Sequence, residues 1–242
     1  MEVSIILPTY NEKENIKILI PKIENELFLA NKIKGEIIVV DDNSPDGTAN
    51  AAARLNKKYH NIVVVVKEKK EGIGAALRVG YNAAKYGIIL SSDSDLSFEI
   101  KDMKKLLDAI NSGNDIVIGS RHMALGRYEK PNLSTLIKGI VSRFGNVLVR
   151  IISGVPIHDF SANFRAIKKH AWQNIRTNEK TNSILLEMIM KSYYKGYKLV
   201  ELPVRFKDRI YGESKLNLKK EAPKFFIKLL YYTWKCRILK SY

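Results

Sequence analysis

Short apolar runs rich in β-branched residues alternate with segments of helical length through the first half of this chain, and no other feature of the sequence constrains the fold as strongly. Five such runs lie at residues 3–7, 37–40, 62–66, 88–90 and 115–118. Each has the length of a buried strand. Buried strands that alternate with helices are typical of a parallel sheet covered by helices on both faces. The sequence therefore predicts an α/β fold whose sheet is mostly parallel.

The remaining elements follow from the same patterns. Helical stripes are predicted over residues 14–31, 74–86, 136–152 and 183–194, and another helix starts at 46–48. Further strands are predicted at 164–167 and 199–204, the second of them running on toward 206. No Ser/Gly-rich linker and no internal repeat interrupts the chain. We predict one domain over residues 1–216, followed by a helical tail over 217–242.

Polar side chains follow four of the predicted strands, at the point where each strand ends. Right-handed crossovers place the carboxyl ends of parallel strands at one edge of the sheet, and ligands of open α/β sheets bind at that edge. We therefore expect these side chains to lie in one cleft. They are Tyr10-Asn11-Glu12, Asp41-Asp42-Asn43-Ser44, Asp93-Ser94-Asp95 and Ser120-Arg121.

Two carboxylates two residues apart, Asp93 and Asp95, are the sharpest chemical signal. After a buried strand, such a pair can bind one hard divalent cation that also bridges a diphosphate. A solvated turn is the alternative for an isolated Asp-x-Asp, but the neighbouring polar strand ends favour the metal site. Asp41 and Asp42 can hydrogen-bond a nucleobase or a ribose, with helix capping as the alternative for the polar residues that follow them.

The charge balance points to anionic ligands. The chain has 41 Lys and Arg against 25 Asp and Glu, a formal charge of +16. Such a surplus attracts nucleic acid, acidic lipid or phosphorylated substrates, and no nucleic-acid-binding motif is present to support the first of these. The single cysteine, Cys236, excludes an intrachain disulfide and a cysteine-based zinc site. No run of about 18 apolar residues predicts a transmembrane helix.

The C-terminal segment combines basic and large apolar residues. This mixture suits a helix that lies in a membrane interface, and docking on the protein's own core is the alternative. The large apolar side chains are Phe225, Phe226, Leu229, Leu230, Tyr232 and Trp234. The polar loop 209–215 precedes this segment. Its Arg209 and Lys215 can fold over a diphosphate, with an ordinary basic surface loop as the alternative.

Taken together, these motifs resemble those of glycosyltransferase family 2, and more narrowly its dolichyl-phosphate mannose synthase group. The resemblance runs from residue 3 to about residue 240 and implies the Rossmann-like GT-A fold with a C-terminal amphipathic helix. The motifs are Pro8-Thr9-Tyr10-Asn11-Glu12, residues 39–48, Asp93-Ser94-Asp95-Leu96, Gly119-Ser120-Arg121, Asp159, Phe164-Arg165, Glu187, Pro203 and Arg209-x-x-Gly-x-Ser-Lys215.

The resemblance also implies roles for single residues. Those implied to bind the nucleotide of a sugar donor are Pro8, Tyr10, Glu12, Val40, Asp42 and Ser94. Those implied to hold Mg²⁺ or Mn²⁺ are Asp93 and Asp95, with Ser97 at a position where close relatives have a metal-binding glutamine. Those implied to close on the phosphates are Arg121, Arg209 and Lys215, and those implied to bind a lipid phosphate are Lys138 and Ser142. Of these, Asp95, Arg121 and Arg209 are the expected catalytic residues.

The implied activity is inverting transfer of a sugar, mannose from GDP-mannose, onto a polyprenyl or dolichyl phosphate. The sequence lacks the further carboxylate that a hydroxyl acceptor would need as a general base, which favours a phosphate acceptor that attacks directly. UDP-glucose or another donor, and a glycan hydroxyl as acceptor, are the alternatives. The expected location is the cytoplasmic face of a membrane, reached through the tail or through a separate membrane subunit.

Overall fold

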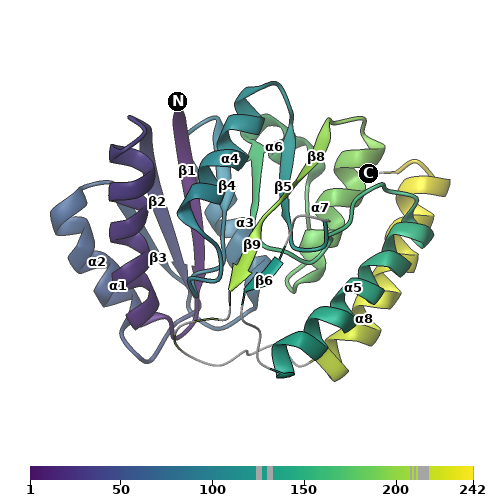
Figure 1. Cartoon of the computed structure of the whole chain (residues 1–242), viewed down its shortest axis with the longest axis horizontal. Coiled ribbons are helices and arrows are strands. Elements are labelled where there is room, and N and C mark those ends of the chain that lie inside the picture. The colour runs from purple at the N-terminus through teal and green to yellow at the C-terminus, as the bar shows by residue number, and fades with distance from the viewer. Residues whose placement is uncertain (124–126, 130–132, 208, 210, 212–217, 242) are drawn as a thin grey trace.

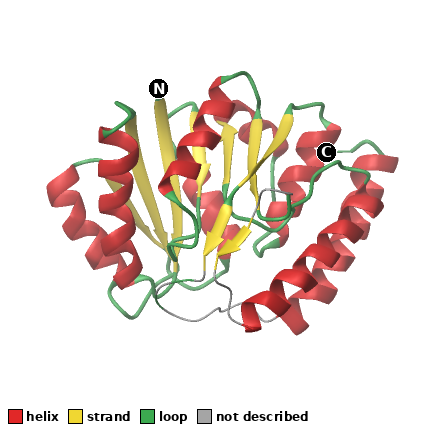
Figure 2. Cartoon of the chain, viewed as in Figure 1, coloured by secondary structure: helices red, strands yellow, loops and turns green. Residues whose placement is uncertain are grey.

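The computed structural model describes residues 1–123, 127–129, 133–207, 209, 211 and 218–241 of the 242-residue chain. Within these ranges, the side chains of 127–129, 133–138, 141 and 218–221 lie outside the description. Helices cover both faces of a central sheet (Figure 2), and this arrangement confirms the predicted α/β class.

The central sheet has seven strands in the order β3-β2-β1-β4-β7-β5-β8. All neighbouring strands are parallel except β7, which runs antiparallel to both β4 and β5. The sheet is therefore mostly parallel, as predicted. The strands are β1 (Glu2–Thr9), β2 (Lys34–Asp41), β3 (Ile62–Val66), β4 (Ile88–Ser91), β5 (Ile116–Ser120), β7 (Arg165–Lys168) and β8 (Leu199–Pro203).

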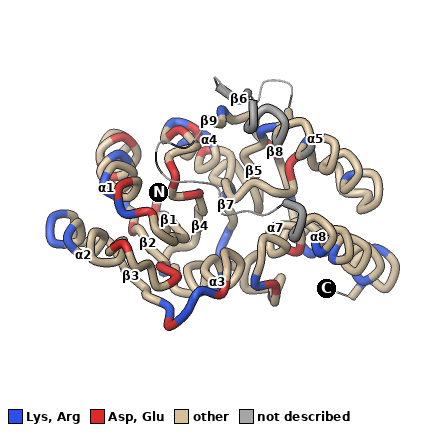
Figure 3. Tube along the Cα trace, turned by 90° about the horizontal axis from the view of Figure 1, so that it is seen from below, with Lys and Arg blue, Asp and Glu red and all other residues tan. Residues whose placement is uncertain are grey.

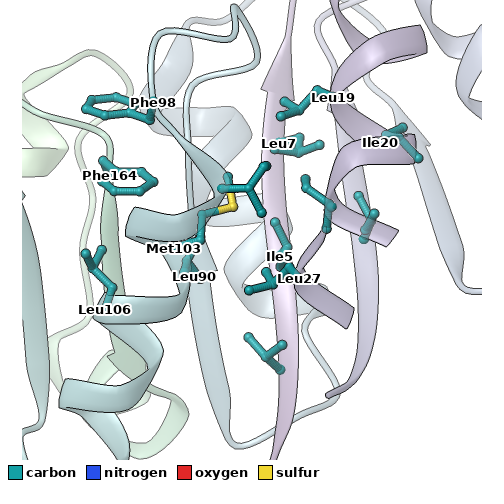
Figure 4. Packing of buried hydrophobic residues seen from close by; sticks show 14 of the residues in the cluster. Ile5, Leu7, Leu19, Ile20, Leu27, Leu90, Phe98, Met103, Leu106 and Phe164 are labelled. Carbon is teal, nitrogen blue, oxygen red and sulfur yellow. The ribbon is translucent and has the colours of Figure 1, made fainter. Parts of the chain in front are cut away.

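Two apolar clusters fill the space between the sheet and its helices, because successive residues of a strand point to opposite faces. On β1, Ile5 and Leu7 face one cluster with α1, η1, α2 and α4, whereas Ile6 faces the other with α3, α6 and α7. Figure 4 shows the first cluster, in which Met103 and Leu106 of α4 lie near Leu90 of β4. The helices are α1 (Lys13–Lys22) with its π-helical continuation η1 (Ile23–Leu29), α2 (Thr48–Tyr59), α3 (Ile73–Ala83), α4 (Ile100–Asn111), α6 (Lys169–Ile175) and α7 (Ser183–Tyr194).

A second, small sheet stands beside the central one and differs from the prediction. It pairs β6 (Arg127–Glu129) in parallel with β9 (Arg205–Lys207). The sequence predicted one strand running from residue 199 toward 206. In the structure β8 ends at Pro203, opposite Ser120, the last residue of β5. The N–H of the buried Val204 still donates to the Ser120 carbonyl at 3.1 Å, and the chain then enters β9.

The last helix, α8 (Leu218–Tyr232), lies beside the long helix α5 (Leu133–Ser153) and continues as η2 (Thr233–Ile238) (Figure 1). One face of α8 and η2 is buried against the domain through Leu229, Tyr232 and Cys236. Among the described residues, no helix is long and apolar enough to cross a membrane.

Candidate functional site

The carboxyl ends of β1, β2, β4 and β5 meet at the lower edge of the sheet in Figure 1, as the sequence predicted. Hydrogen bonds join neighbouring ends directly. The Ser94 hydroxyl after β4 donates to the Pro8 carbonyl of β1 at 2.9 Å, and the Asp42 N–H after β2 donates to the Thr9 carbonyl at 3.0 Å. The residues expected at strand ends therefore share one edge.

Asp93 and Asp95 form the acidic centre of this edge. Arg209 lies 3.1 Å from Asp95, between Nη2 and Oδ2, and the other oxygen of Asp95 accepts from the Ser97 N–H at 3.1 Å. Asn163 donates its Nδ2 to Oδ1 of Asp93 at 3.2 Å. Burial, and then repulsion from Asp95, raise the pKa of Asp93 to about 7. Asp95 is buried and Asp93 is half-buried, so the pair is an anionic site that lacks full charge compensation.

The donor set fits a hard divalent cation. Two carboxylates meet there, and among the described residues the buried hydroxyl of Ser97 and the buried Oδ1 of Asn163 have no hydrogen-bond partner. Within the described part of the chain, no cluster of three or more His, Cys, Asp and Glu forms a metal site. Mg²⁺ and Mn²⁺ prefer oxygen ligands, and Mg²⁺ is typically held by one or two carboxylates together with water and substrate phosphates. The residues present suit that pattern.

Arg121 is held in place by Asp159. The guanidinium donates to both oxygens of Asp159, at 2.8 and 2.9 Å, and to the Ser161 hydroxyl at 2.8 Å. Asp159 is fully buried. Burial by itself would raise the pKa of Asp159, but the charge and hydrogen bonds of Arg121 outweigh it and hold that pKa well below its usual range. Arg121 stands above the Phe206 ring, 5.4 Å from its centroid.

On the β2 side, Asp42 is buried and has protein partners for both oxygens. Lys67 lies 2.7 Å from Oδ1. The Gly72 N–H donates to Oδ2 at 3.1 Å, from a backbone with φ of 100° that favours glycine. An ionised carboxylate oxygen can accept more than one hydrogen bond, so Asp42 can still receive a ligand hydroxyl or amine.

The other predicted nucleotide residues surround Asp42. The Lys70 ammonium lies 3.7 Å from the centroid of the Tyr10 ring, and Glu12 accepts from the Asn15 amide at 2.6 Å. Val40 is buried in the core below the edge and contributes only its carbonyl, which accepts from Thr9. Figure 3 looks onto this edge and shows a segment between β3 and α3 in which blue alternates with red. Its charged residues along the sequence are Lys67, Glu68, Lys69, Lys70 and Glu71.

The predicted acceptor residues are only partly described. Ser142 lies on α5 and its hydroxyl is hydrogen-bonded to Nε2 of His122 at 3.1 Å, next to Arg121. Lys138 belongs to the same helix, but its side chain lies outside the described residues, and so does all of Lys215. His122 is thus a neighbour of this region.

Two residues of the edge were missed by the sequence analysis. Lys67 follows β3 directly, so the strand-end rule that found Asp42 could have found it. Asn163 precedes β7, and because β7 is antiparallel its beginning lies at the edge where the parallel strands end. The antiparallel direction of β7 is therefore the signal that would have identified Asn163 as a residue of this edge.

Comparisons with known proteins place the chain in a family. The sequence model of "Glycosyl transferase family 2" matches residues 4–176. The chain is 36% identical over 220 residues to a dolichol-phosphate mannosyltransferase of Pyrococcus furiosus, covering 90% of this chain and 60% of that protein. It is 30% identical over 220 residues to a polyprenol monophosphomannose synthase of Mycolicibacterium smegmatis, covering 88% and 80%. The chain thus spans less than two thirds of the Pyrococcus relative.

A solved structure supports the fold. Glucosyl-3-phosphoglycerate synthase of Mycobacterium tuberculosis, in complex with Mn²⁺, uridine diphosphate and phosphoglyceric acid, superposes with a TM-score of 0.72 at 16% identity. The match covers 96% of this chain and 78% of that one. The family match over most of the chain and the identity to these two relatives agree with the motifs at the sheet edge. This chain belongs to glycosyl transferase family 2.

Proposed function

We propose that this protein transfers mannose from GDP-mannose to a polyprenyl phosphate such as dolichyl phosphate, with inversion at the sugar. The observation that carries the proposal is the half-buried Asp93 and the buried Asp95 with Arg209 against them, at the edge where a nucleotide diphosphate would lie. Two relatives at 30% identity or more are named for mannosyl transfer involving dolichol phosphate or polyprenol phosphate.

In the proposed reaction, an oxygen of the acceptor phosphate attacks the anomeric carbon of the donor sugar. The bond from that carbon to the donor diphosphate breaks, and the nucleoside diphosphate leaves with the electron pair. Asp93 and Asp95, with Ser97 near them, would hold Mg²⁺ or Mn²⁺. When bound, that cation offsets the charge of the leaving diphosphate. Arg209, which contacts Asp95, and Lys215 are the residues that the family resemblance assigns to the phosphates, and we propose that both would move onto them.

The nucleotide would lie toward β2. Tyr10 with Lys70 offers a flat face with a cation, and Asp42 with Lys67 offers a fixed carboxylate for a base or a ribose. Pro8, Glu12, Val40 and Ser94 complete the group assigned to the donor. Their backbone and side-chain atoms line the joined ends of β1, β2 and β4.

A phosphate acceptor is favoured over a hydroxyl because, among the carboxylates at this edge, Asp93 and Asp95 are assigned to the cation and the buried Asp159 is a poor base. Its pKa is held well below the usual range by Arg121, and a general base works best with a pKa near the operating pH. A phosphate is already anionic at neutral pH and needs no base. The main requirement is then for cations that align the acceptor phosphate with the donor diphosphate, and the Arg121 guanidinium can serve as one of them.

The test is a panel of donors and acceptors with the full chain. We expect mannose transfer from GDP-mannose to a short polyprenyl phosphate, and none to the matched polyprenol that lacks the phosphate. Equal transfer to the free alcohol would overturn the acceptor assignment. Faster transfer from UDP-glucose would favour the second candidate donor, which the uridine diphosphate in the structural neighbour supports.

A variant of Lys138 tests the acceptor site. If Lys138 and Ser142 hold the acceptor phosphate, Lys138→Ala removes a cation that only the acceptor touches. We expect the acceptor KM to rise about tenfold or more, the scale of one charge-assisted hydrogen bond, while the donor KM stays unchanged. Lys138→Arg is the matched control and should retain binding, since a guanidinium fits phosphate in two-point contact. Equal increases in both KM values would contradict this placement.

We further propose that the protein binds peripherally to the cytoplasmic face of a membrane through α5 and α8. Large apolar side chains are exposed on both helices, among them Phe144 and Ile151 on α5 and Phe226 on α8. Exposed basic residues such as Arg143 and Lys224 accompany them. An apolar face with basic residues suits an interfacial helix. Membrane binding through the tail and docking on the core are therefore compatible. α8 packs on the domain through Leu229 and Tyr232 and leaves other side chains, such as Phe226, exposed for the membrane.

Point substitutions test this better than removal of the tail. Truncation after Glu221 would remove the buried Leu229, Tyr232 and Cys236 from the core and would destabilise the domain. We expect Phe144→Glu to weaken sedimentation with anionic vesicles about tenfold or more, since burying a Phe contributes about 1.5–3 kcal/mol.

The matched control is Leu29→Glu. Leu29 and Phe144 are each 75% exposed, but Leu29 lies on η1, away from α5 and α8. This substitution should leave vesicle binding unchanged, and a loss equal to that of Phe144→Glu would contradict the proposed face. High salt should release part of the bound protein by screening the basic residues.

A further inference from the structure

A cavity of about 400 Å³ lies between α5 and the segment that follows it, and the proposed sugar transfer does not use it. Among the described residues it is lined by His122, Arg143, Asn146, Val147, Arg150, Ile151 and His158. One end of the cavity, at His122, adjoins the predicted acceptor residue Ser142, whose hydroxyl is hydrogen-bonded to Nε2 of His122 at 3.1 Å. Its far wall is Arg150, eight residues beyond Ser142 on α5, which is about 12 Å along a helix. A phosphate at Arg150 is therefore a different phosphate from one at Ser142.

The positive charge of the lining comes from its two arginines, Arg143 and Arg150. No carboxylate is among the lining residues that the structure describes. A second cavity of similar volume, between α7 and α8, gives a contrast. There Glu187 and Glu179 already pair with Lys191 and Lys228, at 2.9 and 2.8 Å. The described wall of the cavity beside α5 holds no carboxylate, and its two histidines lie against acidic residues behind the wall, His158 at 2.8 Å from Glu201 and His122 at 4.0 Å from Asp159.

Arg150 is also held in position by His158, which is in turn held by Glu201. The buried carboxylate of Glu201 on β8 accepts from the backbone N–H and from Nδ1 of His158, at 2.7 and 2.8 Å. Nε2 of His158 then faces Nη1 of Arg150 at 2.8 Å. This chain of contacts fixes the direction of the Arg150 guanidinium before any ligand arrives, which lowers the entropic cost of binding.

A second contact joins α5 to the segment that follows it, at Asn146. The buried Asn146 donates to the Ser142 carbonyl at 2.8 Å and accepts from the Phe160 N–H at 2.8 Å. The helix wall and the loop wall are thus pinned at both Asn146 and Arg150. The cavity is a built feature of the fold.

The shape of the ligand follows from the lining. Guanidinium groups bind phosphate oxygens in two-point contacts. Val147 and Ile151, which are 51% and 70% exposed, place apolar surface beside the two arginines. We propose that this cavity is a second anion site, which binds the phosphate group of an amphiphile at the membrane surface and is separate from the acceptor phosphate site.

The first arm of the test uses vesicles of phosphatidylcholine that contain phosphatidic acid, with the full chain. Arg143→Gln/Arg150→Gln removes two charges from the cavity, and Lys224→Gln/Lys240→Gln removes two exposed charges from the C-terminal segment. We expect the cavity variant to bind at least about tenfold more weakly than the control, the scale of one charge-assisted hydrogen bond. Arg143→Gln alone should weaken binding in the same direction and keeps the Arg150 to His158 contact.

The second arm uses inorganic phosphate. It follows the ring NMR signals of His122 and His158 in the wild type and in the cavity variant, with chloride at equal ionic strength as control. Movement in the wild type alone supports a site for a phosphate group. A vesicle difference without movement assigns the site to a lipid headgroup, and movement without a vesicle difference assigns it to free phosphate. Equal vesicle binding by both double variants, together with unmoved signals, overturns the proposal. Neither arm measures turnover, so failure of the proposed sugar transfer would not alter them.

Discussion

Asp95→Ala should lower kcat about 10²-fold or more, which is the scale of losing one preorganised electrostatic contact at a reacting centre. Asp95 is buried, and its two oxygens are directed at once by Arg209 and by the Ser97 N–H. Its loss would remove a proposed cation ligand and leave Arg209 without its partner at the edge. Initial rates at saturating donor and acceptor, with Mn²⁺ added, measure the effect.

A matched carboxylate far from the edge serves as the control. Asp108 on α4 is exposed and pairs with Lys104 at 2.6 Å, so Asp108→Ala should leave kcat unchanged. Binding of Mn²⁺ followed by electron paramagnetic resonance should weaken in Asp95→Ala and not in Asp108→Ala. Full activity of Asp95→Ala in the presence of a metal chelator would show that the Asp93 and Asp95 pair is not a metal site.

Much of the fold could be predicted because its signals are local. Runs such as 37–40 are apolar throughout and too short for a helix, and the structure buries all four of these residues in β2. The order of strands is not a local property. β7 is inserted antiparallel between β4 and β5, with the guanidinium of Arg165 fully buried and donating to the carbonyls of Leu185 and Ala162. The spacing of apolar residues in the sequence does not predict a buried arginine in a core strand.

The same division holds at the candidate site. Residues that follow parallel strands could be placed at one edge by a rule of connection alone, and the contact between Ser94 and Pro8 bears this out. The partners that fix those residues come from distant segments. Asp159 reaches Arg121 across 38 positions, and Asn163 reaches Asp93 across 70. Such contacts depend on how β7 enters the sheet, which the pattern of apolar residues leaves open.

Asp159→Asn should lower the free energy of unfolding by about 3–5 kcal/mol, the scale of breaking a buried ion pair by removing one charge. Asp159 is completely buried and bonds the Arg121 guanidinium through both oxygens. It also accepts from the backbone N–H groups of Arg121, Ser161 and Ala162, which shape the turn that carries it. Urea unfolding at neutral pH measures the loss. Ser161→Ala is the control, since it removes the hydroxyl bonds to Arg121 and Asp159 but keeps the ion pair. It should cost less, about 1.5–3 kcal/mol.

The pH dependence of that loss separates the charge of Asp159 from its shape. The folded pKa of Asp159 is depressed by Arg121, so its carboxylate stabilises the fold above the unfolded pKa, about 3.9 for Asp. This stabilisation disappears as the pH falls below that value toward the folded pKa. The difference in stability between wild type and Asp159→Asn should therefore stay constant from neutral pH down to about pH 5 and shrink below about pH 4. A difference that stays the same at the lowest pH would mean that Asp159 acts through packing. The Arg121 guanidinium would then be held by contacts other than this ion pair.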